Sequence, residues 1–169
     1  MKHFILAVVG GLAVVVETSV APYVSIHGVK PDIVMVYVVL VGMLGGAKDA
    51  GFVGLVAGLL EDVSSGQFLG LFILTRVVTG LAAGLSYEKV FQDRVVVPVV
   101  LVFLGGILGG VVHLFLLSSF GVPLSVSPAT LRVVLSQAAY SAAIAPLALR
   151  GVMRVNLYIR GAADRRRAL

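Results

Sequence analysis

The chain has 169 residues, of which 59% are hydrophobic and only 12% are charged. Soluble domains are about 45–50% apolar and about 25% charged, so a soluble globular protein is excluded and an integral membrane protein is expected. The net charge of +5 is better explained by basic cytoplasmic loops than by nucleic acid, which we do not expect as a partner, and the absence of cysteine excludes disulfides and thiolate metal sites.

Six apolar runs follow one another along the chain, and most reach the ~20 residues that a membrane-spanning helix needs. Only Lys48 and Asp49 interrupt the second and third runs, but a fused helix of about 30 residues would be too long for the hydrocarbon core. The segment GGAKDAG therefore predicts a tight turn between two helices. We expect an all-α membrane protein with six transmembrane helices over residues 4–22, 32–47, 50–61, 67–86, 95–119 and 131–153.

The basic residues support this topology and predict its orientation. With six helices and both termini in the cytoplasm, only Lys30 and Arg132 lie outside, and Arg76 lies within the membrane. Five helices would place the basic tail, residues 154–169, on the opposite side from Lys2, against the positive-inside rule. We expect residues 1–169 to form one transmembrane domain, with a cytoplasmic tail that contacts anionic lipid. The basic residues assigned to the cytoplasm are Lys2, Lys48, Lys89, Arg94, Arg150, Arg154, Arg160, Arg165, Arg166 and Arg167.

Small residues recur four apart in several of the predicted helices. Because residues i and i+4 share a helix face, these glycines form flat strips on which another backbone can pack closely. Packing within the bundle is the simpler interpretation, and a partner helix is the alternative, for which GGILGG in the fifth helix is the best candidate. Pro146 should kink the last helix. The glycines in question are Gly54, Gly58, Gly80, Gly84, Gly105 and Gly109.

Five polar or ionisable side chains fall in the outer half of the predicted bundle, and they come from five different helices. Each ionisable group at membrane depth costs at least ~2.5 kcal/mol, so it should be paired or face a cavity. Arg76 should lean outward, toward the N-terminus of its helix, because helical side chains tilt that way. Glu61, at the end of the third helix, is expected to meet water. The five residues are Glu17, Asp62, Arg76, His113 and Gln137.

This polar layer has two interpretations. The simpler one is a structural ion pair between Arg76 and either Glu17 or Asp62, and the alternative is an outward-facing pocket or a proton path. The chain has no Walker loop, HExxH or GxSxG motif, and His113 has no second ligand four residues on. We therefore expect no enzymatic activity, no cofactor and no metal site.

A set of residues between positions 30 and 85 carries a resemblance to a known family. The segments KPDIVMVYVVL, GFVGLVAGLLEDV and LGLFILTRVVTGLAAG follow one another there. In this pattern and in the six expected helices, the chain resembles the rod shape-determining protein MreD family. The positions that match are Lys30, Pro31, Asp32, Gly51, Phe52, Gly54, Gly58, Leu59, Asp62, Leu69 and Gly70.

The resemblance implies a non-enzymatic scaffold of the bacterial elongation machinery in the cytoplasmic membrane. Its implied partners are a bitopic MreC-like protein, a RodA-type glycosyltransferase with its transpeptidase, and MreB. The MreD fold is similar to the S component of energy-coupling-factor vitamin transporters, so a small-molecule-binding transporter subunit is the alternative. Short outer loops, few aromatic residues and no tryptophan count against that alternative. A channel through the polar layer is disfavoured because the inner halves of the helices are apolar.

Overall fold

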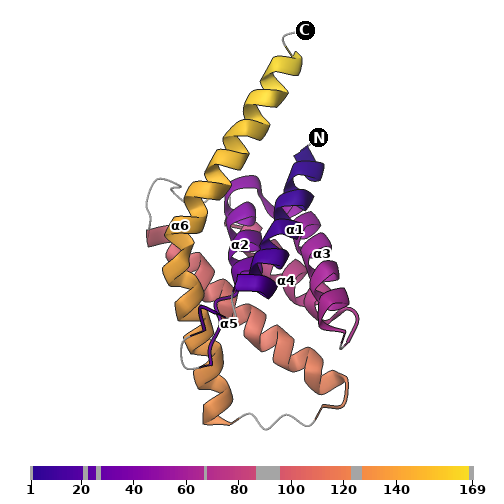
Figure 1. Cartoon of the computed structure of the whole chain (residues 1–169), viewed down its shortest axis with the longest axis vertical. Coiled ribbons are helices and arrows are strands. Elements are labelled where there is room, and N and C mark those ends of the chain that lie inside the picture. The colour runs from indigo at the N-terminus through magenta and orange to yellow at the C-terminus, as the bar shows by residue number, and fades with distance from the viewer. Residues whose placement is uncertain are drawn as a thin grey trace.

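The computed structural model describes residues 2–20, 23–25, 28–66, 68–86, 96–122 and 127–167, with side chains up to residue 159. Within these residues the chain is helical, with no strand, and the helices pack into a single bundle (Figure 1). The prediction of an all-α protein with six helices is confirmed. The helices are α1 (Lys2–Val20), α2 (Ile33–Gly45), α3 (Ala47–Ser65), α4 (Leu71–Gly84), α5 (Val96–Ser119) and α6 (Pro128–Arg167).

Two helices are longer than the sequence predicted. The turn between α2 and α3 consists of Gly46 alone, and its φ of 85° is a backbone conformation that glycine adopts readily. Helix α3 therefore starts three residues earlier than expected. Helix α6 continues to Arg167 through the basic tail, where alanine and arginine favour helix, and it includes Pro146. Its axis changes direction between the orange and yellow parts in Figure 1. The predicted boundary residues 21, 22, 67 and 95 lie outside the described part of the chain.

Helix α2 forms the centre of the bundle. It is apolar on all sides, and every residue from Val34 to Leu44 is buried. It contacts each of the other five helices. The phenol of Tyr37 donates a hydrogen bond of 2.9 Å to the carbonyl oxygen of Leu6 and so ties α2 to α1. The other helices are therefore positioned around one buried axis.

Helices α3 and α4 approach each other closely along glycine. A Cβ atom added at Gly54 would lie 2.7 Å from the carbonyl oxygen of Arg76, and one added at Gly58 would lie 2.6 Å from the Cα of Ile73. Neither position has room for a side chain. This contact places the end of α3 beside the start of α4, which is where the charged side chains meet.

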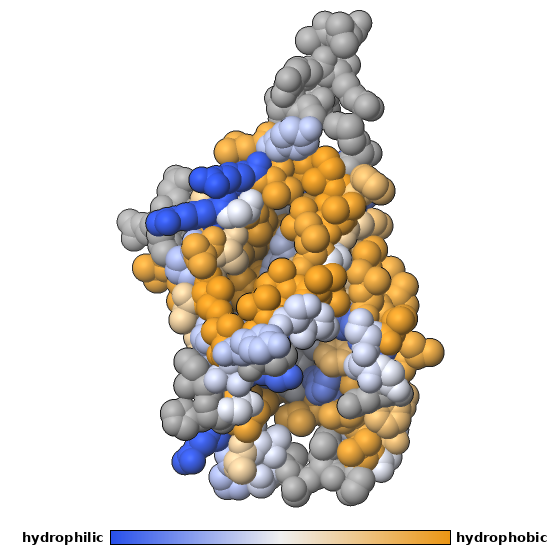
Figure 2. All heavy atoms as spheres, in the orientation of Figure 1, coloured by the Kyte–Doolittle hydropathy of each residue, from blue (hydrophilic) through white to orange (hydrophobic). Residues whose placement is uncertain are grey.

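The surface and helix lengths fit a membrane protein. Helices α1, α5 and residues Pro128–Ile159 of α6 are long and apolar enough to cross a bilayer, and α2 and α4 are shorter apolar helices. Figure 2 shows hydrophobic residues over the middle of one face and hydrophilic residues toward its ends. Helix α1 begins and α6 ends at the same end of the bundle, as the predicted topology requires (Figure 1). The chain is therefore a multi-pass membrane protein.

Candidate functional site

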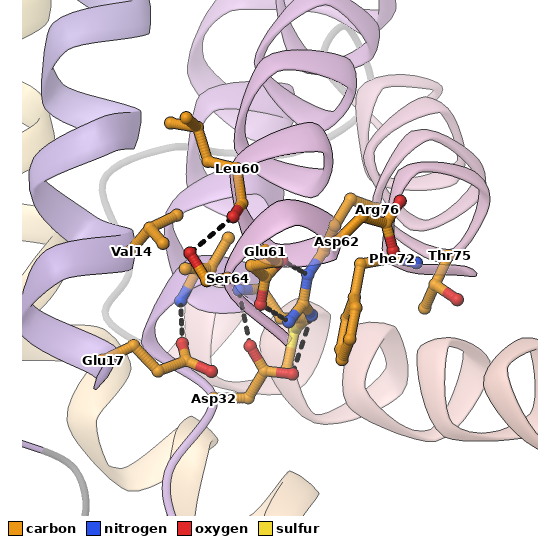
Figure 3. Close-up of polar contacts among 12 residues, drawn as sticks. Val14, Glu17, Asp32, Leu60, Glu61, Asp62, Ser64, Phe72, Thr75 and Arg76 are labelled. Atoms are coloured by element: carbon orange, nitrogen blue, oxygen red, sulfur yellow. Dashed lines mark hydrogen bonds and ion pairs between the residues drawn. The ribbon is translucent and has the colours of Figure 1, made fainter. Parts of the chain in front are cut away.

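Arg76 is the centre of a buried charge network at the end of the bundle opposite the start of α1. Its side chain is only 4% exposed and points from α4 between two carboxylates (Figure 3). Nε and Nη2 donate to the two oxygens of Glu61 at 2.7 and 2.6 Å, and Nη1 donates to Oδ2 of Asp32 at 2.7 Å. A bidentate arginine–carboxylate pair fixes geometry as well as charge. The network therefore locks α4 to α3 and to the start of α2.

Two carboxylates converge on the N-terminus of α2. Oδ1 of Asp32 accepts a hydrogen bond of 2.8 Å from the backbone N–H of Met35, which makes Asp32 the N-cap of the helix. Oε2 of Glu17, from α1, accepts one of 2.8 Å from the N–H of Val34. The backbone N–H of Asp32 in turn donates to Oγ of Ser141 on α6 at 2.9 Å. The start of α2 thus joins α1, α4 and α6.

Asp62 has a different role from the one the sequence suggested. Its carboxylate accepts hydrogen bonds of 2.8, 2.9 and 3.3 Å from the backbone N–H groups of Gly70, Phe72 and Ile73. Backbone N–H groups at the start of a helix have no partner within the helix. The carboxylate of Asp62 accepts hydrogen bonds from these groups of α4 and does not pair with Arg76. Arg76 is paired with Glu61 and Asp32, not with Glu17 or Asp62.

The expectation that Glu61 meets water is wrong. Glu61 is 8% exposed and Asp62 is 1% exposed, so both carboxylates are buried. Successive helical residues point about 100° apart, so the two face different neighbours. Asp62 faces the backbone of α4 and Glu61 faces its arginine. Of these two neighbouring acids, only Glu61, which has the longer side chain, reaches the guanidinium of Arg76.

A cavity of about 650 Å³ opens beside this network. Its polar wall is formed by Glu17, Asp32 and Arg76, and α5 and α6 form the wall across from them. The face drawn in Figure 2 is hollowed in its lower half, where hydrophilic residues lie below the apolar surface. This volume lies within the range of about 300–1,000 Å³ that is typical of small-molecule sites. The remaining lining residues are Met35, Phe72, Thr75, Gly106, Gly109, Gly110, His113, Leu114, Ala129, Thr130, Val133, Val134, Gln137 and Ala138.

Four of the five polar residues singled out from the sequence line this cavity. Glu17, Arg76, His113 and Gln137 come from α1, α4, α5 and α6, whereas Asp62 lies behind the wall as the cap of α4. The ring of His113 lies 5.3 Å from that of Phe72, measured between centroids. Within the described part of the chain, every buried side-chain nitrogen or oxygen has a hydrogen-bond partner, and no cluster of acidic or histidine side chains could hold a metal ion.

The glycines considered for a partner surface lie against neighbouring helices of the same bundle. Gly105 faces Val39 and Thr79, and Gly109 faces Thr79 and Thr75. In GGILGG, Gly106 approaches Ala138 on α6, while Gly106, Gly109 and Gly110 also line the cavity. A Cβ atom added at Gly110 would lie 2.5 Å from Cγ1 of Val134, so Gly106 and Gly110 let α6 approach α5 closely along the wall of the cavity. The remaining glycines of that set pack α3, α4 and α2 together: Gly54, Gly58, Gly80 and Gly84.

Three residues at the site were not assigned to it from the sequence: Asp32, Glu61 and Phe72. Asp32 directly precedes a long apolar run and follows Pro31, a pattern that indicates a helix N-cap. Glu61 could have been found by considering both acids of the pair as partners for the single arginine in the membrane. Phe72 gave no signal, because an aromatic residue in a membrane helix is usual; in the structure its ring lies 5.8 Å from the guanidinium carbon of Arg76.

Residues 4–158 match the family described as "ECF transporter, substrate-specific component". No curated protein and no solved structure gave a match. The family match covers all six helices up to the basic end of α6, so it describes the whole bundle.

The match overturns the resemblance to MreD, and with it the predicted role in cell shape and the partners MreC, RodA and MreB. The structure gives the reason for the error. The residues that carried the resemblance have structural roles: Gly54 and Gly58 allow α3 to pack on α4, Asp62 caps α4, and Asp32 caps α2. Such residues indicate a fold and do not separate families that share it. The chain belongs to the family of substrate-specific components of ECF transporters.

Proposed function

We propose that the chain is the substrate-binding subunit of an energy-coupling-factor transporter in the bacterial cytoplasmic membrane. It binds a small molecule in the cavity between α5, α6 and the Arg76 network, and it has no enzymatic activity of its own. The observation that carries the proposal is that a ligand-sized cavity coincides with the buried charged layer in a chain of this family. The positive-inside rule places this end of the bundle on the outer side, where a substrate enters.

The rigidity of the polar wall supports this role. The side chains of Glu17, Asp32 and Arg76 are each held by a hydrogen bond or ion pair to a different helix. A binding site that is organised before the ligand arrives loses less conformational entropy on binding. The opposite wall, made by α5 and α6, is mainly small and apolar and accommodates the uncharged part of a ligand.

In this proposal the partner is an energising module, with its ATPases and a transmembrane T component. The test is affinity purification of the tagged chain in mild detergent from membranes of its own bacterium. Recovery of the ATPases with the chain is expected. Recovery of an MreC-like protein in their place, or of no ATPase, would contradict the proposal.

Ligand binding can be tested separately by filling the cavity. Val133 lines the cavity and is exposed, so Val133→Phe places a ring in the space without disturbing the buried core. Leu135→Phe is the matched control, because Leu135 lies on the same helix and is equally exposed but does not line the cavity. Val133→Phe should abolish retention of the native ligand and leave assembly with the ATPases unchanged.

A further inference from the structure

The cavity wall carries more negative than positive charge. Glu17 and Asp32 line it, and Glu61 lies directly behind it in contact with Arg76. Among the described lining residues Arg76 is the only cation, and His113 counts as neutral at pH 7. With all three carboxyls ionised, they share one guanidinium, which gives an excess of two negative charges. Asp62 is not included in this count because its carboxylate accepts hydrogen bonds from three backbone N–H groups.

Helix dipoles do not remove this excess. The N-termini of α2 and α6 both face the cavity, and each supplies at most about half a positive charge. Granting both in full still leaves about one negative charge without compensation. The carboxyl left without a cationic partner among the described residues is that of Glu17, which accepts a hydrogen bond from the backbone N–H of Val34.

At membrane depth, a carboxyl without a partner either takes up a proton or is accompanied by a cation or water. A metal ion lacks ligands here, because the described residues hold no cluster of three suitable side chains. The cavity is also far larger than a metal ion, and most of its lining is apolar. Phe72 also lines the cavity, but its ring already lies beside Arg76 and His113, so the carboxyls are the groups that would meet a ligand's cation.

Building on the proposed function, we infer that the substrate is an organic cation: an ammonium or similar group that lies against Glu17 and Asp32, with an apolar body between α5 and α6. The ligand's positive charge completes the charge balance that Arg76 only partly provides. Substrates that carry a carboxylate or phosphate at this end are disfavoured by the same wall.

The test uses three probes with the same indole body: tryptamine, which is cationic, tryptophol, which is neutral, and indole-3-acetate, which is anionic. The chain has no tryptophan, so indole fluorescence reports on the probe alone. The full-length protein in lipid nanodiscs should bind tryptamine at least about tenfold more tightly than tryptophol, and indole-3-acetate most weakly. Glu17→Gln, which keeps an oxygen for the Val34 N–H, should weaken tryptamine about tenfold and leave tryptophol unchanged.

Asp49→Asn is the matched control for the change in net charge. Asp49 is a buried carboxylate at the other end of the bundle, where it pairs with Lys2 at 2.6 Å, and it does not line this cavity. Its replacement should leave the ranking of the three probes unchanged.

Three outcomes would overturn the inference: binding of tryptophol or indole-3-acetate as tight as that of tryptamine, no effect of Glu17→Gln, or no saturable binding of tryptamine. None of these bears on recovery of the ATPases with the chain. A protein that assembles with them yet prefers the neutral probe retains the proposed function and loses only the cationic substrate.

Discussion

The pairing of Arg76 with Glu61 can be tested by measuring free energies of unfolding. Arg76→Met removes the guanidinium from the network and leaves Glu61 buried without its partner. Breaking a buried pair on one side costs about 3–5 kcal/mol. We therefore expect Arg76→Met to lower the free energy of unfolding by about that amount, and Arg76→Lys to lower it less, since a lysine retains the charge but not the bidentate geometry.

Two double-mutant cycles identify the partner. The bonds of 2.7 and 2.6 Å between Arg76 and Glu61 predict a coupling energy of about 1–3 kcal/mol between Arg76→Met and Glu61→Gln. Asp62 is held by the backbone of α4, so the cycle of Arg76→Met with Asp62→Asn should be additive to within about 0.5 kcal/mol. The assay is reversible unfolding in mixed detergent–SDS micelles, followed by circular dichroism. A larger coupling in the Asp62 cycle than in the Glu61 cycle would refute the assignment.

Two further changes test how the helices pack, each against a matched control in the same unfolding assay. Gly58→Ala should lower the free energy of unfolding by about 1–3 kcal/mol, because the new Cβ would lie 2.6 Å from the backbone of α4; Gly151→Ala, where nothing lies within 4 Å, should be neutral or slightly stabilising. Tyr37→Phe should cost about 1 kcal/mol by removing the bond to Leu6, whereas Tyr158→Phe, at a residue that is 64% exposed, should have no effect. Equal effects of variant and control in either pair would contradict the packing described above.

Much of the bundle could be predicted from the sequence because membrane helices leave strong compositional signals. The apolar runs and the distribution of lysine and arginine were enough to predict six helices. The exact turn at Gly46 could not be predicted, because Lys48 and Asp49 resemble loop residues; in the structure Asp49 is buried and paired with Lys2, which lets α3 begin before it.

The polar layer was predictable in depth but not in its pairings. Helical rise and topology place Glu17, Arg76, His113 and Gln137 at a similar level, and the structure brings these four to one cavity. Which acid pairs with Arg76 depends on rotations of about 100° between neighbouring residues and on how many backbone donors each carboxylate satisfies. Those quantities follow from the packing of α3 on α4.

The family could not be read from the residues that seemed most specific. Glycines and helix caps such as Gly58 and Asp62 preserve a fold, and different functions use the same fold. The cavity was missed for a related reason. Its walls come from α1, α2, α4, α5 and α6, and the space between them depends on how these helices pack, which the sequence does not give.

The most direct test of the account is native mass spectrometry of the protein purified from its own membranes in mild detergent. We predict that the wild-type chain retains one small molecule per protein, that Leu135→Phe retains it too, and that Val133→Phe, which fills the cavity, loses it. Absence of a bound small molecule from the wild-type chain, or equal retention by the two variants, would contradict the claim that this cavity binds the substrate.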